Sequence, residues 1–168
     1  MWTPIDISLV LLVQKVQEHR SSPKIGKTRV VTTPVIDKSL LWAFFDGVSQ
    51  GDPPIGGAGG VIFINETNKI SFKLGLCRAT NSKAELSALW ATLKLAKDKQ
   101  IAKLHIYGDS KTVIKWAQGK NNIRAPHLQN FLKAIRSLQS SFEVILFNHI
   151  YREFNAEVDM LSKQALAI

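Results

Sequence analysis

The sequence predicts an α/β domain in which a five-stranded mixed sheet carries helices on both of its faces. An unbroken apolar run at 40–45 is typical of a strand that is buried on both sides. Two more strand-like segments follow before any long helix, which indicates an antiparallel start. Helices then alternate with strands, which requires crossover connections and parallel pairing. The expected order is β-β-β-α-β-α-α-β-α.

Each element is expected from its local pattern. The apolar run ends on Asp46 and Gly47, and the Gly/Pro-rich segment 51–57 predicts a turn. Apolar residues at helical spacing after Asn81 predict the first long helix. The elements are expected as strands at 40–47, 60–64 and 70–77, a helix at 82–97, a strand at 104–107, helices at 110–118 and 127–138, a strand at 142–148 and a helix at 155–167.

The first 39 residues are expected to be an extension or linker. Apolar residues in 5–20 recur close to helical spacing and predict one short amphipathic helix. Segment 21–29 is polar, basic and interrupted by Pro and Gly, as linkers are. We therefore place the boundary near 34–39 and the domain at 40–168.

Composition narrows the class of protein. The 168 residues are 45% hydrophobic and 21% charged, which suits one globular domain with a modest extension. No apolar stretch reaches the roughly 18 to 20 residues of a membrane span, no signal-peptide pattern is present, and Cys77 is the single cysteine. We expect a soluble monomer without a membrane partner, located in the cytoplasm or nucleus.

The charge balance favours a polyanionic partner. Lys and Arg number 22 against 13 Asp and Glu, for a net charge of +9. Nucleic acid is the first candidate, because binding it releases condensed counterions. The alternative is a basic protein whose charge serves only its solubility.

Four acids stand where the predicted fold could gather them. Asp46 ends the first strand and Asp109 ends the strand at 104–107, and parallel neighbours deliver their ends to one edge of a sheet. Glu85 lies on the first long helix beside the stripe that faces the sheet. Asp159 lies in the first turns of the last helix. These positions predict a carboxylate cluster.

Each acid also has an ordinary explanation. Asp109 could cap the following helix, and Asp159 with Lys163 has the i,i+4 spacing of a helical ion pair. Glu85 could be a helix-face acid, and Asp46 a turn former before glycine. Taken singly, none of the acids indicates a site.

Together the acids indicate a metal centre. Clustered carboxylates repel one another unless a cation neutralises them, and Mg²⁺ prefers oxygen ligands. Two such ions about 4 Å apart can activate a water and stabilise the leaving oxygen of a phosphodiester. The sequence has no P-loop, nucleophile elbow or dinucleotide fingerprint. His149 lies near a strand end, and we expect it to have a structural role and not that of a catalytic base.

Four segments resemble ribonuclease H, and most closely the ribonuclease H domains of plant retrotransposon polyproteins. They are Phe45-Asp46-Gly47, Thr80-Asn81-Ser82-Lys83-Ala84-Glu85-Leu86, Gly108-Asp109-Ser110 and the segment from His149 to Asp159. The resemblance covers about 40–168 and implies a ribonuclease H-like fold.

The resemblance implies a reaction and a set of roles. Asp46, Glu85, Asp109 and Asp159 would bind two Mg²⁺ or Mn²⁺ ions and hydrolyse the RNA strand of an RNA/DNA hybrid. Within Arg78-Ala79-Thr80-Asn81, Arg78 and Thr80 would hold a DNA phosphate, and Asn81 would meet the RNA, whose 2′-hydroxyl distinguishes it from DNA. The alternative for Thr80 and Asn81 is a helix cap, and both roles are compatible.

The sequence departs from the family pattern at three places. Asp52 stands where many members carry an Asn that contacts a 2′-hydroxyl, and its carboxylate would be repelled by phosphates. Arg152 stands where many members carry a histidine on a flexible loop, and in this the chain resembles archaeal-type members. Arg152 could handle the leaving group or product, bind a phosphate, or simply be solvated. Segment 119–126 is short where bacterial-type members carry a basic protrusion.

Residues outside segment 119–126 are therefore expected to bind the substrate. Lys111 and Lys115 share one helix face, and Trp116 could stack on a base, although a core position is its commoner role. We expect an enzyme from a retroelement polyprotein, covalently linked to a reverse transcriptase domain. The alternatives are an inactive hybrid- or RNA-binding module and a DNA-processing nuclease of the same fold, which has no reason to carry the segment from Arg78 to Asn81.

Overall fold

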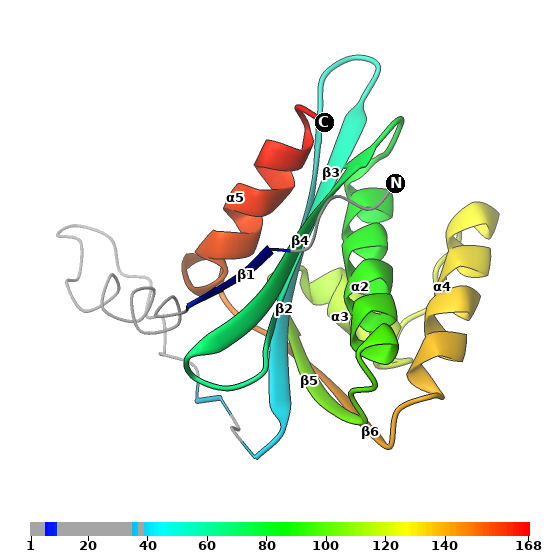
Figure 1. The fold of residues 1–168 in the computed structure, drawn as a ribbon. Helices are drawn as coiled ribbons and strands as arrows, with labels where there is room; N and C mark the ends of the chain where they lie inside the picture. The colour runs from blue at the N-terminus through cyan, green and yellow to red at the C-terminus, as the bar shows by residue number, and fades with distance from the viewer. Residues whose placement is uncertain (1–5, 10–34, 37–38) are drawn as a thin grey trace, which may run out of the picture.

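The computed structural model describes residues 6–9, 35–36 and 39–168 as one sheet with helices on both faces (Figure 1). Along the chain the elements are β1 (Asp6–Leu9), β2 (Leu41–Gln50), β3 (Ile55–Phe63), β4 (Asn68–Leu76), α2 (Asn81–Asp98), β5 (Lys103–Gly108), α3 (Lys111–Ala117), α4 (Pro126–Gln139), β6 (Val144–His149), a 3₁₀ turn at Arg152–Phe154 and α5 (Ala156–Ala165). Strands lie in the order β1-β4-β3-β2-β5-β6.

The expected mixed sheet is confirmed. β2 pairs antiparallel with β3 and parallel with β5, and β6 is parallel to β5. Figure 1 shows α5 on one face of the sheet and α2, α3 and α4 on the other. Two crossover connections carry the chain through these helices from β4 to β5 and from β5 to β6. The expected order of elements in 40–168 is correct.

The N-terminal extension differs from the expectation. Residues 6–9 form a strand that pairs antiparallel with Asn68–Ser71 of β4, so the sheet gains a sixth strand at its edge. The helix expected at 5–20 is therefore wrong at 6–9, and its remaining part lies outside the described residues. The pairing has a plain cause, because the outer edge of β4 presents backbone donors and acceptors that a helix could not use.

Two boundaries also move. β2 continues past Asp46 to Gln50, and β3 begins at Ile55, inside the expected turn. β3 is rich in glycine, which lowers strand propensity, but Gly57 and Gly59 face α5 so closely that any Cβ there would overlap its backbone. Packing against α5 therefore favours glycine at these two strand positions, and strand propensity does not reflect this packing.

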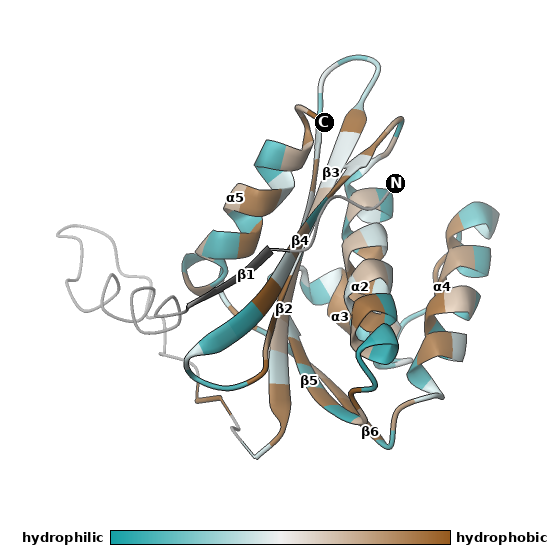
Figure 2. Ribbon diagram, viewed as in Figure 1, coloured by the Kyte–Doolittle hydropathy of each residue, from teal (hydrophilic) through white to brown (hydrophobic). Residues whose placement is uncertain are grey.

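The central strand is buried on both faces, as its apolar run predicts. Ala43 and Phe45 pack in the core under α2, whereas Trp42 and Phe44 pack in the core on the α5 side. Figure 2 shows hydrophobic residues along the part of β2 that lies in the core. This packing fixes the strand, and therefore fixes Asp46 at the end of its buried stretch.

None of the helices in the described part of the chain is long and apolar enough to cross a membrane.

Candidate active site

Asp46 and Asp109 lie side by side because of the parallel strand pair. The ladder between β2 and β5 ends with Phe45 opposite Gly108, so each acid is the next residue after the last pair. Asp46 continues in β2, paired with Gly59 of β3, while the chain after Gly108 leaves the sheet. The two carboxylates therefore meet at one edge, as the sequence predicts for parallel strands.

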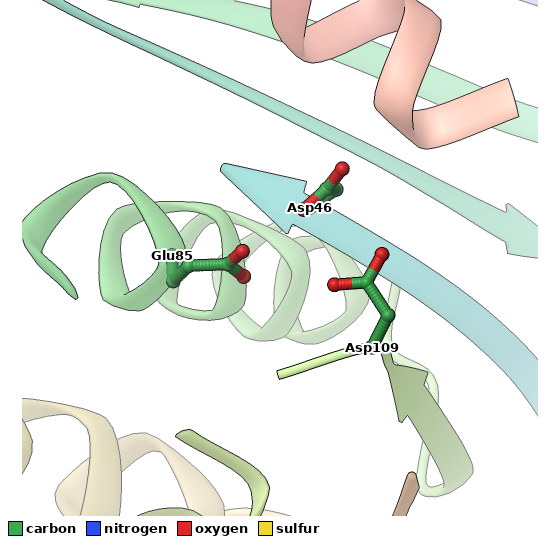
Figure 3. Close-up of side chains that lie close together, drawn as sticks. All are labelled: Asp46, Glu85 and Asp109. Atoms are coloured by element: carbon green, nitrogen blue, oxygen red, sulfur yellow. The ribbon is translucent and has the colours of Figure 1, made fainter. Parts of the chain in front are cut away.

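Glu85 reaches the same place from the first turns of α2. Thr80 caps this helix, with its Oγ1 accepting a hydrogen bond from Lys83 N at 3.3 Å. Gly47 lets the helix approach β2, because a Cβ there would overlap the backbone of Ala84 and Glu85. One carboxylate oxygen each from Asp46, Glu85 and Asp109 lies within 4.8 Å of the others, and Figure 3 shows them pointing toward one another.

The three carboxyl groups hold their protons more tightly than usual. Burial, followed by the charge of Asp109, raises the pKa of Asp46 to about 7. Burial, followed by the charge of Asp46, raises the pKa of Glu85 to about 10. Burial also raises the pKa of Asp109, although a hydrogen bond from Asn155 and the charge of Arg152 oppose the rise. Ionisation of all three acids is unfavourable in this buried cluster, and a bound cation would stabilise their ionised forms.

The donor set fits a hard divalent cation. All three groups offer carboxylate oxygens, which Mg²⁺ and Mn²⁺ accept. Glu85 Oε2 is buried and has no hydrogen-bond partner among the described residues, so one of its lone pairs is left for another ligand. Asp46 is held by its neighbour, since Gly47 N donates to Asp46 Oδ1 at 2.9 Å.

Asp159 lies beside this cluster rather than inside it. It lines a cleft of about 460 Å³ together with Asp46, Glu85 and Asp109. Its Oδ2 is 3.0 Å from Lys163 Nζ, so the ordinary explanation of an i,i+4 ion pair also holds. Lys163 lines the cleft too.

The ordinary explanation of Asp109 is wrong. Ser110, not Asp109, caps α3, with its Oγ accepting from Val113 N at 3.3 Å. Asp46 is likewise no turn former, because it lies within β2.

The segment from Arg78 to Asn81 is anchored to the β2–β3 hairpin. Asn81 Oδ1 accepts from Ser49 N at 3.0 Å, and Ser49 Oγ donates to Ala79 O at 2.6 Å. Asn81 lines the cleft. Thr80 is the helix cap described above, and Arg78 has an exposed side chain.

The other expected substrate residues are scattered. Arg152 lines the cleft and also a second cleft of about 530 Å³ that Lys111 and His149 line. Lys115 is exposed on α3 and Asp52 is exposed in the hairpin turn, and neither lines these two clefts. Trp116 packs against the main core, which is the commoner of the two roles expected for it.

Sequence reasoning missed Asn155. This residue is 2% exposed and donates from Nδ2 both to Phe45 O at 3.0 Å and to Asp109 Oδ2 at 3.3 Å. The sequence places it only at the start of the helix expected at 155–167, and in the structure it precedes α5 without making a side-chain capping bond. Only the fold places its amide between the ends of two strands.

Comparison with known families gives one match over most of the domain. A family model described as reverse transcriptase-like matches residues 44–165. Ribonuclease HI of Halobacterium salinarum is 32% identical over 126 residues, which is 74% of this chain and 63% of that protein. An Arabidopsis thaliana protein named for ribonuclease H is 25% identical over 170 residues, 93% of this chain and 26% of that protein. The chain thus spans less than two thirds of either relative.

Solved structures share the fold. The crystal structure of ribonuclease H1 from Halobacterium salinarum is similar with a TM-score of 0.71 at 30% identity, over 76% of this chain and 97% of that chain. A ribonuclease H1 isolated from compost, crystallised in complex with an RNA/DNA hybrid, has a TM-score of 0.69 at 26% identity, over 76% and 96% of the two chains. These structural neighbours are ribonucleases H.

Proposed function

This chain belongs to the ribonuclease H-like family, and we propose that it is an endoribonuclease that hydrolyses the RNA strand of RNA/DNA hybrids. One observation carries the proposal. Three carboxylates from β2, α2 and the end of β5 bring oxygens within 4.8 Å of one another inside a cleft of a basic domain. A polyanion would be attracted to the domain, and a divalent cation would let it approach the acids.

Asp46, Glu85, Asp109 and Asp159 would hold two Mg²⁺ or Mn²⁺ ions. When bound, these ions would supply activation of a water and stabilisation of the leaving oxygen of a phosphodiester. Asp46 interacts with both of the other acids, since its charge raises the pKa of Glu85 and the charge of Asp109 raises the pKa of Asp46. The packed strand holds its carboxylate fixed, so little reorganisation accompanies binding.

Arg152 is proposed to face the substrate phosphate near the scissile bond. It lines both clefts, and its charge acts on Asp109 strongly enough to oppose the effect of burial on that carboxyl group's pKa. A guanidinium group can donate two parallel hydrogen bonds to a phosphate. Lys111 lines the neighbouring cleft and extends the positive surface.

The segment from Arg78 to Asn81 is proposed to recognise the hybrid. Ser49 holds Asn81 at the rim of the cleft, which leaves its amide nitrogen to donate to a 2′-hydroxyl. Arg78 and Thr80 would hold a phosphate of the DNA strand. Thr80 already caps α2, so its hydroxyl would serve the helix and the substrate together.

The chain is further proposed to act in retroelement replication, beside a reverse transcriptase domain of one polyprotein. The reverse transcriptase-like family model and the longer Arabidopsis relative support this context. Hybrids formed by reverse transcription would be its substrate, in the cytoplasm or the nucleus.

Cleavage assays test the proposed function. Labelled RNA/DNA hybrid, RNA duplex and DNA duplex are incubated with the protein in Mg²⁺, in Mn²⁺ and with chelator. We expect cleavage of the hybrid alone, only with metal, and a loss of more than about 100-fold in Asp46→Asn or Asp109→Asn, since both remove a proposed metal ligand.

The matched control is Asp98→Asn, at the exposed end of α2, where Asp98 pairs with Lys94. This variant should cleave at the unaltered rate. Tight binding of the hybrid without cleavage at any metal concentration would instead indicate a binding module that has lost turnover.

A further inference from the structure

Asn155 joins the two strand ends that carry the central acids. Its single amide nitrogen donates to Phe45 O, the backbone atom just before Asp46, and to the carboxylate of Asp109. The residue stands immediately before α5, the helix that carries Asp159. One buried side chain therefore contacts β2 and the end of β5 at the start of a third element.

The orientation of this amide is fixed by its partners. Both contacts are oxygen acceptors, so the NH₂ group must face them, and a flipped amide would bring three oxygens together. The amide oxygen, Asn155 Oδ1, is buried without a hydrogen-bond partner among the described residues. The side chain thus leaves its own acceptor unpaired while both of its donors are used, which marks donation as its role.

We propose that Asn155 is a positioning residue that holds the Asp109 carboxylate at a fixed place relative to Asp46. The role rests on the metal centre proposed above. Asp109 follows the last residue of β5 and its backbone leaves the sheet there, so no strand pairing restrains it. Because like-charged Asp46 lies beside it, an untethered Asp109 would turn toward solvent.

The amide is not needed to hold α5 in place. Val158 and Ala165 of this helix are buried against the sheet, and Ser162 packs over Gly57 and Gly59. The side chain of Asn155 makes no capping bond to the helix, and its backbone carbonyl, which accepts from Asp159 N at 3.1 Å, is unchanged by loss of the amide. Loss of the amide should therefore loosen the metal ligand far more than it loosens the fold.

Metal binding by calorimetry separates the two roles. Mn²⁺ is titrated into the unaltered protein, into Asn155→Leu, which keeps the number and branching of the heavy atoms but cannot donate, and into the smaller Asn155→Ala. The control is Val158→Ala, which removes buried volume from the same helix within the core on the α5 side of the sheet. We expect the Asn155 variants to bind Mn²⁺ about tenfold or more weakly, as is typical when a partner of a metal ligand is lost, and Val158→Ala to bind it normally.

Kinetics give a second readout. With saturating metal, kcat for hybrid cleavage should fall about tenfold or more in Asn155→Leu, while KM for the hybrid stays within about twofold, because the amide touches a metal ligand and not the substrate. If Asn155→Leu binds Mn²⁺ as tightly as Val158→Ala does at equal thermal stability, Asn155 is only structural and the inference is wrong. If the unaltered protein binds no Mn²⁺, the metal centre itself is overturned, and this role with it.

Discussion

Gly47 lies against the backbone of Glu85, with no room for a side chain between strand β2 and helix α2. The contact sets the distance between the strand that carries Asp46 and the helix that carries its partner acid. A residue with no chemistry of its own thus determines whether the carboxylate cluster can form.

Gly47→Ala is expected to push α2 away from β2 and to separate Glu85 from Asp46. Overpacking of this kind costs about 1–3 kcal/mol of the free energy of unfolding, which denaturant titration measures. Hybrid cleavage should fall further than stability, because the lost proximity affects the proposed metal ligands directly.

Gly75→Ala is the matched control. A Cβ at Gly75 meets the side chain of Ile168 at 3.0 Å and Ala165 O at 3.3 Å, which a shift of a few tenths of an ångström accommodates, whereas at Gly47 it would lie 2.3 Å from the backbone of Ala84. The control should retain both stability and cleavage. Equal behaviour of the two alanine variants would show that the close approach at Gly47 has no special importance.

The stability of the metal-free protein is expected to fall as the pH rises. The pKa of Asp46 in the fold is about 7 and that of Glu85 about 10, above the ordinary values of 3.8 and 4.5. The folded protein therefore binds more protons than the unfolded chain, and this part of its stability is complete below about pH 4 and is lost as the pH rises through the folded values. Melting temperatures in chelator should decrease between about pH 5 and about pH 8.

Two controls accompany the pH series. Asp46→Asn removes one of the repelling charges, so its melting temperature should depend less on pH. Mg²⁺ should raise the melting temperature of the unaltered protein more at the higher pH, where the acids are ionised. A melting temperature that increases over this range in chelator would contradict the raised pKa values.

The order of the elements and the placement of the central acids follow from the sequence. The apolar run before Asp46 predicts a doubly buried strand, and the alternation after 80 predicts that Asp109 ends its parallel neighbour. These conclusions hold because hydrophobic periodicity and crossover topology depend on local patterns and general chain geometry.

Other features depend on contacts that no local pattern reports. Gly57 belongs to the turn expected at 51–57, yet its close packing against α5 makes it part of a strand. The sequence places Asn155 at the start of the last helix, but it does not show that the ends of two strands lie across from its side chain. Residues 6–9 resemble part of a helix, yet they pair with the free edge of β4.

Arg78→Ala is expected to weaken hybrid binding without changing stability. The side chain is exposed, so its removal leaves no cavity. If it neutralises one phosphate, the logarithm of the binding constant should depend less steeply on the logarithm of salt concentration, by about one unit. Binding is measured by fluorescence anisotropy at several salt concentrations.

Lys99→Ala serves as the control for that series, since Lys99 is an exposed base at the opposite end of α2. It removes the same charge from the protein but should leave the salt dependence unchanged. An identical loss of affinity in both variants would assign the effect to net charge and not to a phosphate contact of Arg78.

Lys163→Met is expected to lower the Mg²⁺ concentration needed for half-maximal cleavage. Lys163 Nζ lies 3.0 Å from Asp159 Oδ2 at the rim of the cleft, so its charge competes with a cation for that carboxylate. The Lys163 side chain is 56% exposed, and solvent weakens such pairs, so the shift should be only about two- to fivefold. Lys94→Met breaks an equivalent i,i+4 pair with Asp98 on α2 and should leave the Mg²⁺ dependence unchanged. A higher Mg²⁺ requirement in Lys163→Met would mean that the lysine holds Asp159 in position for the ion and does not compete with it.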